Sequence, residues 1–190
     1  MKDFLGTLFL ITGNSGSGKD SLISGVFVKY PSDLKQIYAP NRYITRMPSE
    51  FEKNIAITPE DFREMEIHGK FALKWKIYGL NYGISVQIEN YLEKGHPVII
   101  NVSRTIVKQA RERYRNIKVV FIEVPLEITL QRIKNRKRES NDLLKKRIER
   151  ARKNQKFPEA DFTIDNSGKL DDAIDQLLIY IISNLDRTEK

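Results

Sequence analysis

Residues 13–21 read "GNSGSGKDS" and combine the residue types and spacing that bind phosphate. Gly13, Gly18 and Lys19 fit the phosphate-binding pattern G-x-x-x-x-G-K-[ST] up to its last position. The glycines let backbone N–H groups point inward, the following helix adds its positive end, and the lysine reaches the β and γ phosphates. We therefore expect nucleotide phosphates to bind at Gly13, Asn14, Ser15, Gly16, Ser17, Gly18, Lys19, Asp20 and Ser21.

Asp20 stands where the pattern has the magnesium-holding hydroxyl of Ser or Thr. A carboxylate oxygen is a hard ligand, so Asp20 is a candidate Mg²⁺ ligand, directly or through water. The alternative is an acidic residue that the helix dipole favours in the first turn. Ser21 is a poorer substitute, because it is rotated about 100° around the helix from position 20.

Arginines supply a second set of phosphate-binding candidates. Arg42 and Arg46 in "RYITR" have guanidinium groups suited to bidentate contact with an anion, or they are a solvated pair. The segment 132–153 holds eleven Lys or Arg and three Asp or Glu, which accounts for the whole net charge of +8. A solvated helical face is the alternative for this segment. Its lack of aromatic residues argues against nucleic-acid binding.

The composition limits the class of protein. A chain of 190 residues with 40% hydrophobic residues fits one globular domain. The absence of cysteine excludes disulfides and thiolate chemistry, and favours a reducing compartment. No segment approaches the roughly 18 to 20 apolar residues that span a bilayer, so we expect a soluble cytoplasmic protein with no membrane partner.

The order of the elements predicts an α/β fold with a mainly parallel sheet. Apolar runs predict strands at 7–12, 97–102, 118–124 and 161–165. Amphipathic patterns and capping residues predict helices at 19–29, 59–67, 86–93, 105–115, 126–136, 143–153 and 170–185. Between Leu34 and Tyr82 the pattern is mixed, with strand-like pieces at 35–39 and 71–78 around one helix. We interpret this interval as an inserted acceptor-binding subdomain.

The motifs together resemble the guanylate-kinase-like group of P-loop kinases over nearly the whole chain. The loop "SGSGKDSL" and "RYITR" are more similar to the ribose 1,5-bisphosphate phosphokinase family, in which the aspartate after the lysine is expected. Further matches to that family are Ala72, Leu73, Lys74 and Trp75, then Asn81, Tyr82 and Gly83, and finally Asn101, Ser103 and Arg104.

The resemblance implies a three-layer P-loop NTPase fold and a single guanylate-kinase-like domain. Its core would comprise 1–33, 84–131 and 157–190, with an acceptor-binding insertion at about 34–83 and a helical lid at about 132–156. The implied reaction is ATP-dependent phosphorylation of ribose 1,5-bisphosphate to 5-phospho-α-D-ribose 1-diphosphate, with Mg²⁺. The partners would be these small molecules, and a homodimer is one option for the assembly.

The resemblance also distributes roles among residues. Arg42, Arg46 and Arg104 would hold the acceptor's phosphates, and Asn166 would border the adenine. Hydroxyl groups of the sugar would meet Asn54, Tyr82, Asn101 and Ser103. Catalysis would rest on Lys19 with three lid arginines, Arg132, Arg136 and Arg147. No general base is required, because a phosphate acceptor is already anionic at neutral pH.

Two departures from guanylate kinases argue against a guanine substrate. Leu73 aligns with the glutamate that pairs with guanine N–H groups, and Asn101 and Ser103 align with two carboxylates. A buried donor left unpaired costs about 1–3 kcal/mol. The alternatives are a guanylate or other nucleoside monophosphate kinase, and an inactive interaction module that binds acidic peptides through Arg42 and Arg46.

Overall fold

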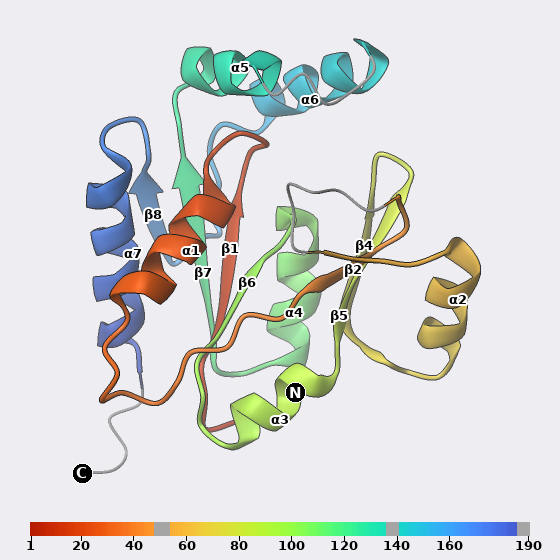
Figure 1. The fold of residues 1–190 in the computed structure, drawn as a ribbon, viewed down its shortest axis with the longest axis vertical. Coiled ribbons are helices and arrows are strands. Elements are labelled where there is room, and N and C mark those ends of the chain that lie inside the picture. The colour runs from red at the N-terminus through yellow and green to blue at the C-terminus, as the bar shows by residue number, and fades with distance from the viewer. Residues whose placement is uncertain (48–53, 136–140, 186–190) are drawn as a thin grey trace.

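The central sheet of the molecule is parallel throughout. A computed structural model describes residues 1–47, 54–135 and 141–185, and Figure 1 shows their elements. The spatial order of the strands is β6 (Val98–Asn101), β1 (Leu8–Gly13), β7 (Ile117–Glu123) and β8 (Phe162–Asp165). These strands coincide with the four predicted apolar runs to within one or two residues at each end.

Helices cover both faces of this sheet, which makes three layers. Successive residues of a strand point to opposite faces. Leu8 and Leu10 pack with α3 (Gln87–Glu93) and α4 (Val107–Arg113). Phe9 and Ile11 pack with α1 (Lys19–Lys29) and α7 (Leu170–Ser183). Because both faces of β1 are buried, its sequence is a continuous apolar run rather than an alternating one.

A second, smaller sheet stands beside the first (Figure 1). Its spatial order is β3 (Asn54–Ala56), β2 (Arg42–Ile44), β5 (Leu80–Ser85) and β4 (Phe71–Ile77). The β2–β3 pair is parallel, whereas β2–β5 and β4–β5 are antiparallel. Helix α2 (Pro59–Ile67) packs on this sheet through Phe62, whose ring stacks on Phe71 at 4.5 Å. Arg42 of this sheet bonds to the main sheet, where its Nη1 donates to Asn101 O at 3.2 Å.

The strand-like pieces at 35–39 and 71–78 have different outcomes. The second corresponds to β4, which forms a hairpin with β5. Strand β5 itself was not predicted from the sequence. The first is not a strand, and its extended chain makes one parallel bridge, from Tyr38 to Val98. The backbone there still bonds to the edge of β6, with Tyr38 N–H donating to Pro97 O at 2.9 Å. The prediction of a strand over 35–39 is therefore wrong.

The helices follow the capping residues. Thr58 Oγ1 accepts from the Asp61 N–H at 3.0 Å, which confirms the start of α2. Ser103 caps a short 3₁₀ helix, η1 (Arg104–Ile106), which continues into α4. The helix predicted at 105–115 is thus two pieces and ends at Arg113. Helix α7 ends at Ser183 rather than 185.

Two basic helices lie across the end of the parallel sheet toward which its strands point (Figure 1). They are α5 (Leu126–Asn135) and α6 (Asn141–Lys153). Helix α6 begins two residues before the predicted position. Arg136, a predicted catalytic residue, lies outside the described residues.

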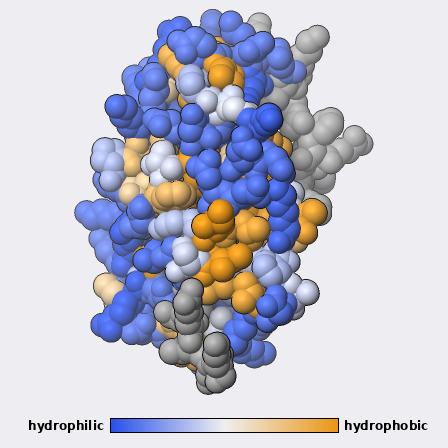
Figure 2. Space-filling view, turned by 90° about the vertical axis from the view of Figure 1, so that its left-hand side faces the viewer, coloured by the Kyte–Doolittle hydropathy of each residue, from blue (hydrophilic) through white to orange (hydrophobic). Residues whose placement is uncertain are grey.

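Exposed apolar side chains lie on the outer layer opposite α4. Val28 of α1 and Ile179 of α7 are exposed, and Figure 2 shows apolar surface on the side of the molecule that carries α7. Scattered exposed apolar residues are common on folded domains. Across the described ranges, the structure contains no helix with the length and apolarity needed to cross a membrane.

Candidate active site

The phosphate loop joins β1 to α1 in the predicted place. Gly16 and Gly18 have φ of 84° and 89°, a conformation that disfavours any residue with a Cβ. At Gly18 a Cβ would also lie 2.4 Å from Nδ2 of Asn166. The loop backbone and the start of α1 therefore require glycine here, as the phosphate-binding pattern predicts.

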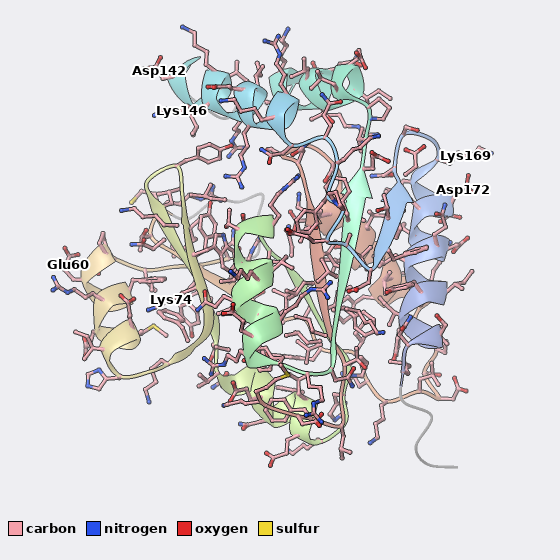
Figure 3. The ribbon with its side chains drawn as sticks, turned by 180° about the vertical axis from the view of Figure 1, so that it is seen from behind. Glu60, Lys74, Asp142, Lys146, Lys169 and Asp172 are labelled. Atoms are coloured by element: carbon pink, nitrogen blue, oxygen red, sulfur yellow. The ribbon has the colours of Figure 1, made fainter. Side chains whose placement is uncertain are left out.

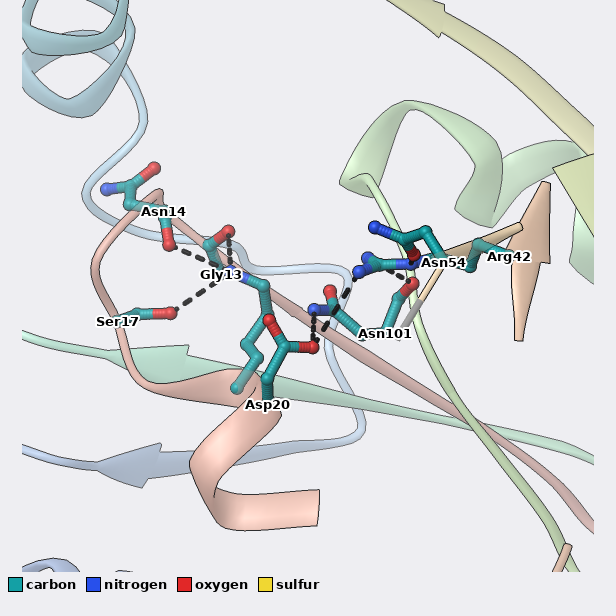
Figure 4. Close-up of polar contacts among 8 residues, drawn as sticks. Gly13, Asn14, Ser17, Asp20, Arg42, Asn54 and Asn101 are labelled. Atoms are coloured by element: carbon teal, nitrogen blue, oxygen red, sulfur yellow. Dashed lines mark hydrogen bonds and ion pairs between the residues drawn. The ribbon is translucent and has the colours of Figure 1, made fainter. Parts of the chain in front are cut away.

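Lys19 points back over the loop. Its Nζ donates to the carbonyl oxygens of Gly13 at 2.9 Å and Asn14 at 2.8 Å, and to Ser17 Oγ at 3.3 Å (Figure 4). The ammonium group thus lies above the curve of backbone that would surround a phosphate. This position fits a lysine that contacts the phosphates of a nucleotide.

Asn166 supports the loop from the side of β8. Its side chain is 2% exposed, and Nδ2 donates to Ser17 O at 2.8 Å. The carbonyl oxygen of Asn166 accepts from Arg132 Nη2 at 3.2 Å. The structure therefore gives Asn166 a contact with the loop, whereas the predicted contact with adenine stays a prediction.

A cavity of about 170 Å³ lies between the loop, the second sheet and α6. It brings together most of the predicted site residues: Gly13, Asn14, Ser15, Gly16, Gly18, Lys19, Asp20, Arg42, Arg46, Tyr82, Asn101, Ser103, Arg104 and Arg147. The predicted residues Ser17, Ser21, Asn54, Arg132 and Asn166 are described but lie outside its lining. Five chain segments therefore meet at one cavity.

The charge of this cavity is strongly positive. Among the described residues that line it, the cations are Lys19, Arg42, Arg46, Arg104, Arg147 and Arg150, against the single carboxylate of Asp20. Guanidinium groups in this density bind phosphate oxygens through charge-assisted hydrogen bonds. The cavity suits two anionic ligands held close together.

Asp20 fits one kind of metal site. Its side chain is 64% exposed, and Oδ1 accepts from Asn101 Nδ2 at 2.6 Å. No cluster of three or more His, Cys, Asp or Glu occurs in the part of the chain that the structure describes. A single carboxylate fits Mg²⁺ held mainly by phosphate oxygens and water, which is how this ion binds in phosphotransferases.

Arg104 makes most of its contacts with the protein itself. Its Nη2 donates to Asn14 Oδ1 at 3.0 Å and to Asn154 O at 2.9 Å, and Nη1 donates to Lys156 O at 3.2 Å. The guanidinium lies 5.1 Å from the ring centroid of Phe121 and 5.4 Å from that of Phe157. Burial, together with the charge of Arg150, lowers the pKa of Arg104 to about 10. Arg104 therefore links the loop to the end of α6.

Helix α6 reaches both the loop and the second sheet. Arg147 Nη1 donates to Ser15 Oγ at 3.0 Å, and Arg150 Nη2 donates to Ser103 Oγ at 3.2 Å. Both guanidinium groups lie 5.8 Å from the ring centroid of Tyr78 at the tip of the β4–β5 hairpin. Arg147 was predicted at this site, whereas Arg150 and Tyr78 were not.

Two signals in the sequence point to the residues that were missed. Arg150 follows Arg147 by three residues, and this spacing places both on one face of a helix. Tyr78 precedes Gly79 between two apolar runs, a pattern that indicates a hairpin turn. Trp75 also lines the cavity, with its ring stacked on Tyr82 at 5.3 Å. This stack places Tyr82 on a wall of the cavity.

The fold and the loop together define a P-loop phosphotransferase. The sequence profile of the guanylate kinase family matches residues 6–184. The ribose 1,5-bisphosphate phosphokinase PhnN of Bradyrhizobium diazoefficiens is 36% identical over 87% of this chain and 83% of its own. The protein of the same name from Pseudomonas paraeruginosa is 37% identical over 93% and 95%. The chain belongs to the guanylate kinase family and, within it, to the ribose 1,5-bisphosphate phosphokinases.

Solved structures agree with this fold. The guanylate kinase of Anaplasma phagocytophilum superposes with a TM-score of 0.70, covering 99% of this chain and 90% of its own at 16% identity. At that identity the likeness concerns the fold alone. It confirms the predicted guanylate-kinase-like α/β fold with its mainly parallel sheet.

Proposed function

We propose that this protein transfers the terminal phosphoryl group of ATP to ribose 1,5-bisphosphate, giving 5-phospho-α-D-ribose 1-diphosphate and ADP. The observation that carries the proposal is the cavity in which six cations face one another around a single carboxylate among its described lining residues. These cations come from the phosphate loop, from β2 and the bend after it, from η1 and from α6. Relatives that are 36–37% identical carry the name of this activity. The substrates are thus small molecules, a nucleotide and a phosphorylated sugar.

The reaction needs positive charge more than it needs a base. An oxygen of the acceptor's C1 phosphate forms a bond to the γ phosphorus, and the bond from that phosphorus to the β–γ bridging oxygen breaks. The attacking phosphate is already ionised, so no proton has to be removed. The described residues lining the cavity accordingly include no histidine. Repulsion between two anions is the main barrier, and fixed cations lower it.

The arrangement supports a division of work among these cations. Lys19 and the loop backbone bind the β and γ phosphates. Arg42 and Arg46, from the second sheet, bind the acceptor's phosphate. Arg147, which contacts Ser15 of the loop, stabilises charge on the group in transfer. Asp20 would hold Mg²⁺, which would neutralise charge on the nucleotide's phosphates when bound.

The residue type at position 73 supports a sugar acceptor over guanylate. Leu73 is 1% exposed, belongs to the apolar core beside Ile84 and lies outside the cavity lining. It supplies no acceptor for the N–H groups of guanine, and a buried donor left unpaired costs about 1–3 kcal/mol. We therefore expect poor turnover of guanylate.

Acceptor profiling tests the proposal. ADP release is measured with ribose 1,5-bisphosphate and with GMP, and the product is identified by ³¹P NMR, in which a diphosphate gives coupled signals. We expect kcat/KM for GMP to be lower by about 10²-fold or more. The Lys19→Ala variant serves as the background control. An equal or higher kcat/KM for GMP would overturn the proposal, and a lack of ATP binding would favour an interaction module.

A further inference from the structure

Asp20 lies between the phosphate loop and the acceptor side of the cavity (Figure 4). It belongs to the first turn of α1, yet its Oδ1 accepts from Asn101 Nδ2 at the end of β6, at 2.6 Å. The same oxygen lies 3.8 Å from Nη2 of Arg42 on β2. One carboxylate thus reaches from the nucleotide side to two residues of the acceptor side.

Arg42 is fixed by its other contacts. Its Nε donates to Asn54 Oδ1 at 3.1 Å, and its Nη1 donates to Asn101 O at 3.2 Å. The side chain is 16% exposed, so its guanidinium has little room to move. These bonds hold the plane of the guanidinium and turn its Nη2 edge toward Asp20.

In this geometry, Asp20 and the acceptor's phosphate compete for the Nη2 edge of Arg42. An acceptor phosphate that binds the Nη2 edge of Arg42 must displace the carboxylate or lie beside it. Both groups are negative, and like charges a few ångströms apart repel. Asp20 therefore lowers the affinity of Arg42 for an anion while the two are paired.

The side chain of Asp20 has room to change partners. It is 64% exposed, whereas that of Arg42 is 16% exposed. Asp20, Arg42 and Asn101 also border an adjoining cavity of about 760 Å³ beside α1, so space lies on both sides of this network. A divalent cation that arrives with the nucleotide is a stronger partner for a carboxylate than a guanidinium at 3.8 Å.

We propose that Asp20 couples the two substrate sites, so that the acceptor binds tightly only after the metal–nucleotide complex. This inference rests on the proposed function. When Asp20 turns to the cation, the Nη2 edge of Arg42 and the amide of Asn101 become available to the acceptor. A Ser or Thr hydroxyl at position 20 could hold the metal but could not pair with Arg42. The aspartate thus makes the order of substrate binding matter. A loop with Ser or Thr at this position would lack that effect.

Calorimetric titration with ribose 1,5-bisphosphate tests the coupling without turnover. The acceptor's Kd is measured alone, with the non-hydrolysable β,γ-imido analogue of ATP plus Mg²⁺, and with that analogue in EDTA. For the native protein we expect Kd to fall about tenfold with the Mg²⁺ complex, within the range usual for coupled sites. The analogue in EDTA should change it much less.

Two variants remove the carboxylate. In Asp20→Ser and in Asp20→Asn the acceptor should bind more tightly than in the native protein without nucleotide, and the tenfold effect should disappear. Asp33→Ser removes the same charge from an exposed residue outside the cavity lining and should keep native coupling. Circular dichroism verifies that each variant is folded.

The outcomes separate the two proposals. Native coupling in both Asp20 variants would overturn the inference, and so would weaker acceptor binding in them without nucleotide, since Asp20 would then bind the acceptor directly. If the native protein binds ribose 1,5-bisphosphate under none of the three conditions, the proposed function itself fails.

Discussion

Arg104 illustrates how the surroundings of one residue determine its role. The resemblance of "NVSR" to the ribose 1,5-bisphosphate phosphokinases implies that Arg104 is a phosphate ligand. Its donors instead bond to Asn14, Asn154 and Lys156, three groups of the protein. With a pKa of about 10 it stays charged at neutral pH. It therefore adds positive potential to the cavity while its hydrogen bonds stabilise the loop and the end of α6.

Arg147 is the residue of α6 for which the structure gives the sharpest prediction. Because its guanidinium contacts Ser15 of the phosphate loop, it is placed to contact the group in transfer. We expect Arg147→Ala to lower kcat by about 10³-fold, on the scale of an arginine finger, with a smaller change in KM. Steady-state kinetics measures both constants.

Lys146→Ala is the matched control for Arg147→Ala. Lys146 is exposed, lies on the same helix and carries the same charge (Figure 3). It should leave kcat within about twofold, as expected for an exposed charge that is screened by solvent. A rise in KM with kcat unchanged in Arg147→Ala would show that Arg147 binds the ground state only.

The spacing of residues predicted the loop but not the contacts of Asp20. Gly13, Gly18 and Lys19 are local in sequence, and their geometry follows from the strand–loop–helix connection. The partners of Asp20 are Arg42 and Asn101, which the fold brings to it from 22 and 81 residues away. Such contacts depend on the packing of two sheets, which no pattern of residue types specifies.

The β4–β5 hairpin is the element that connects the second sheet to α6. Tyr78 at its tip has φ of 52°, which is rare and costly for a residue with a Cβ. Strain of this kind often marks a functional position. The ring of Tyr78 lies 5.8 Å from the guanidinium groups of Arg147 and Arg150, within the range of cation–π contacts. The hairpin thus helps to hold α6 beside the cavity.

Substitution of Tyr78 distinguishes the effect of its backbone strain from the effect of its ring contacts with Arg147 and Arg150. Asparagine suits the turn because it tolerates positive φ before Gly79, but it lacks the ring. We expect Tyr78→Asn to keep or raise the unfolding temperature and to lower kcat/KM about fivefold, since each cation–π contact contributes roughly 0.5–1 kcal/mol. Thermal unfolding and steady-state kinetics measure the two effects.

Tyr78→Phe is the control for this prediction, because it keeps the ring and loses only the hydroxyl. Its kcat/KM should stay near the native value. Equal losses of kcat/KM in Tyr78→Phe and Tyr78→Asn would assign the role to the hydroxyl group instead of the ring.

Elements with strong apolar signals were predicted, whereas β3 and β5 were not. Strands β1, β6 and β7 are almost wholly buried, and α7 places Ala173, Ile174, Leu177 and Ile181 in the core, so these elements leave strong apolar signals. Strand β3 has three residues, none of which is buried. Residues 35–39 have β-forming side chains, but they meet the sheet at one bridge only. Tertiary contacts determine whether such segments form strands.

At the scale of the whole molecule, the site lies where three units meet. The end of the parallel sheet carries the loop, β2 and the bend after it carry Arg42 and Arg46, and α6 carries Arg147. We propose that the chain moves as a core of 1–33, 84–131 and 157–190, an acceptor-binding insertion of about 34–83 and a lid of about 132–156. This division places each set of cations on a different unit, so closure brings them together.

The side of the core away from the cavity is held by a charged network around Glu89 of α3. Oε1 of Glu89 accepts from Arg113 Nη2 and from Tyr114 Oη, each at 2.8 Å, and Oε2 forms an ion pair with Lys2. The network ties the start of the chain to α3 and to the end of α4. The side chain of Glu89 is 15% exposed. Burial opposes its ionisation, but the bonds to Lys2, Tyr114 and Arg113 prevail and hold its pKa below the ordinary 4.5.

This network predicts how stability depends on pH. A carboxyl whose pKa is lower in the folded state contributes stability above its unfolded pKa, and that contribution is lost as pH falls through the folded pKa. We expect Glu89→Gln to lower the free energy of unfolding at pH 7 by about 1.5–3 kcal/mol, the range for hydrogen bonds to charged groups. Below an unfolded pKa of 4.5 the difference from the native protein should shrink as Glu89 takes up a proton.

Urea denaturation at pH 7 and at more acidic values measures this difference in the free energy of unfolding, with Glu93→Gln on the exposed side of α3 as the control. A difference that stays constant over this range would mean that the charge of Glu89 contributes nothing to the fold.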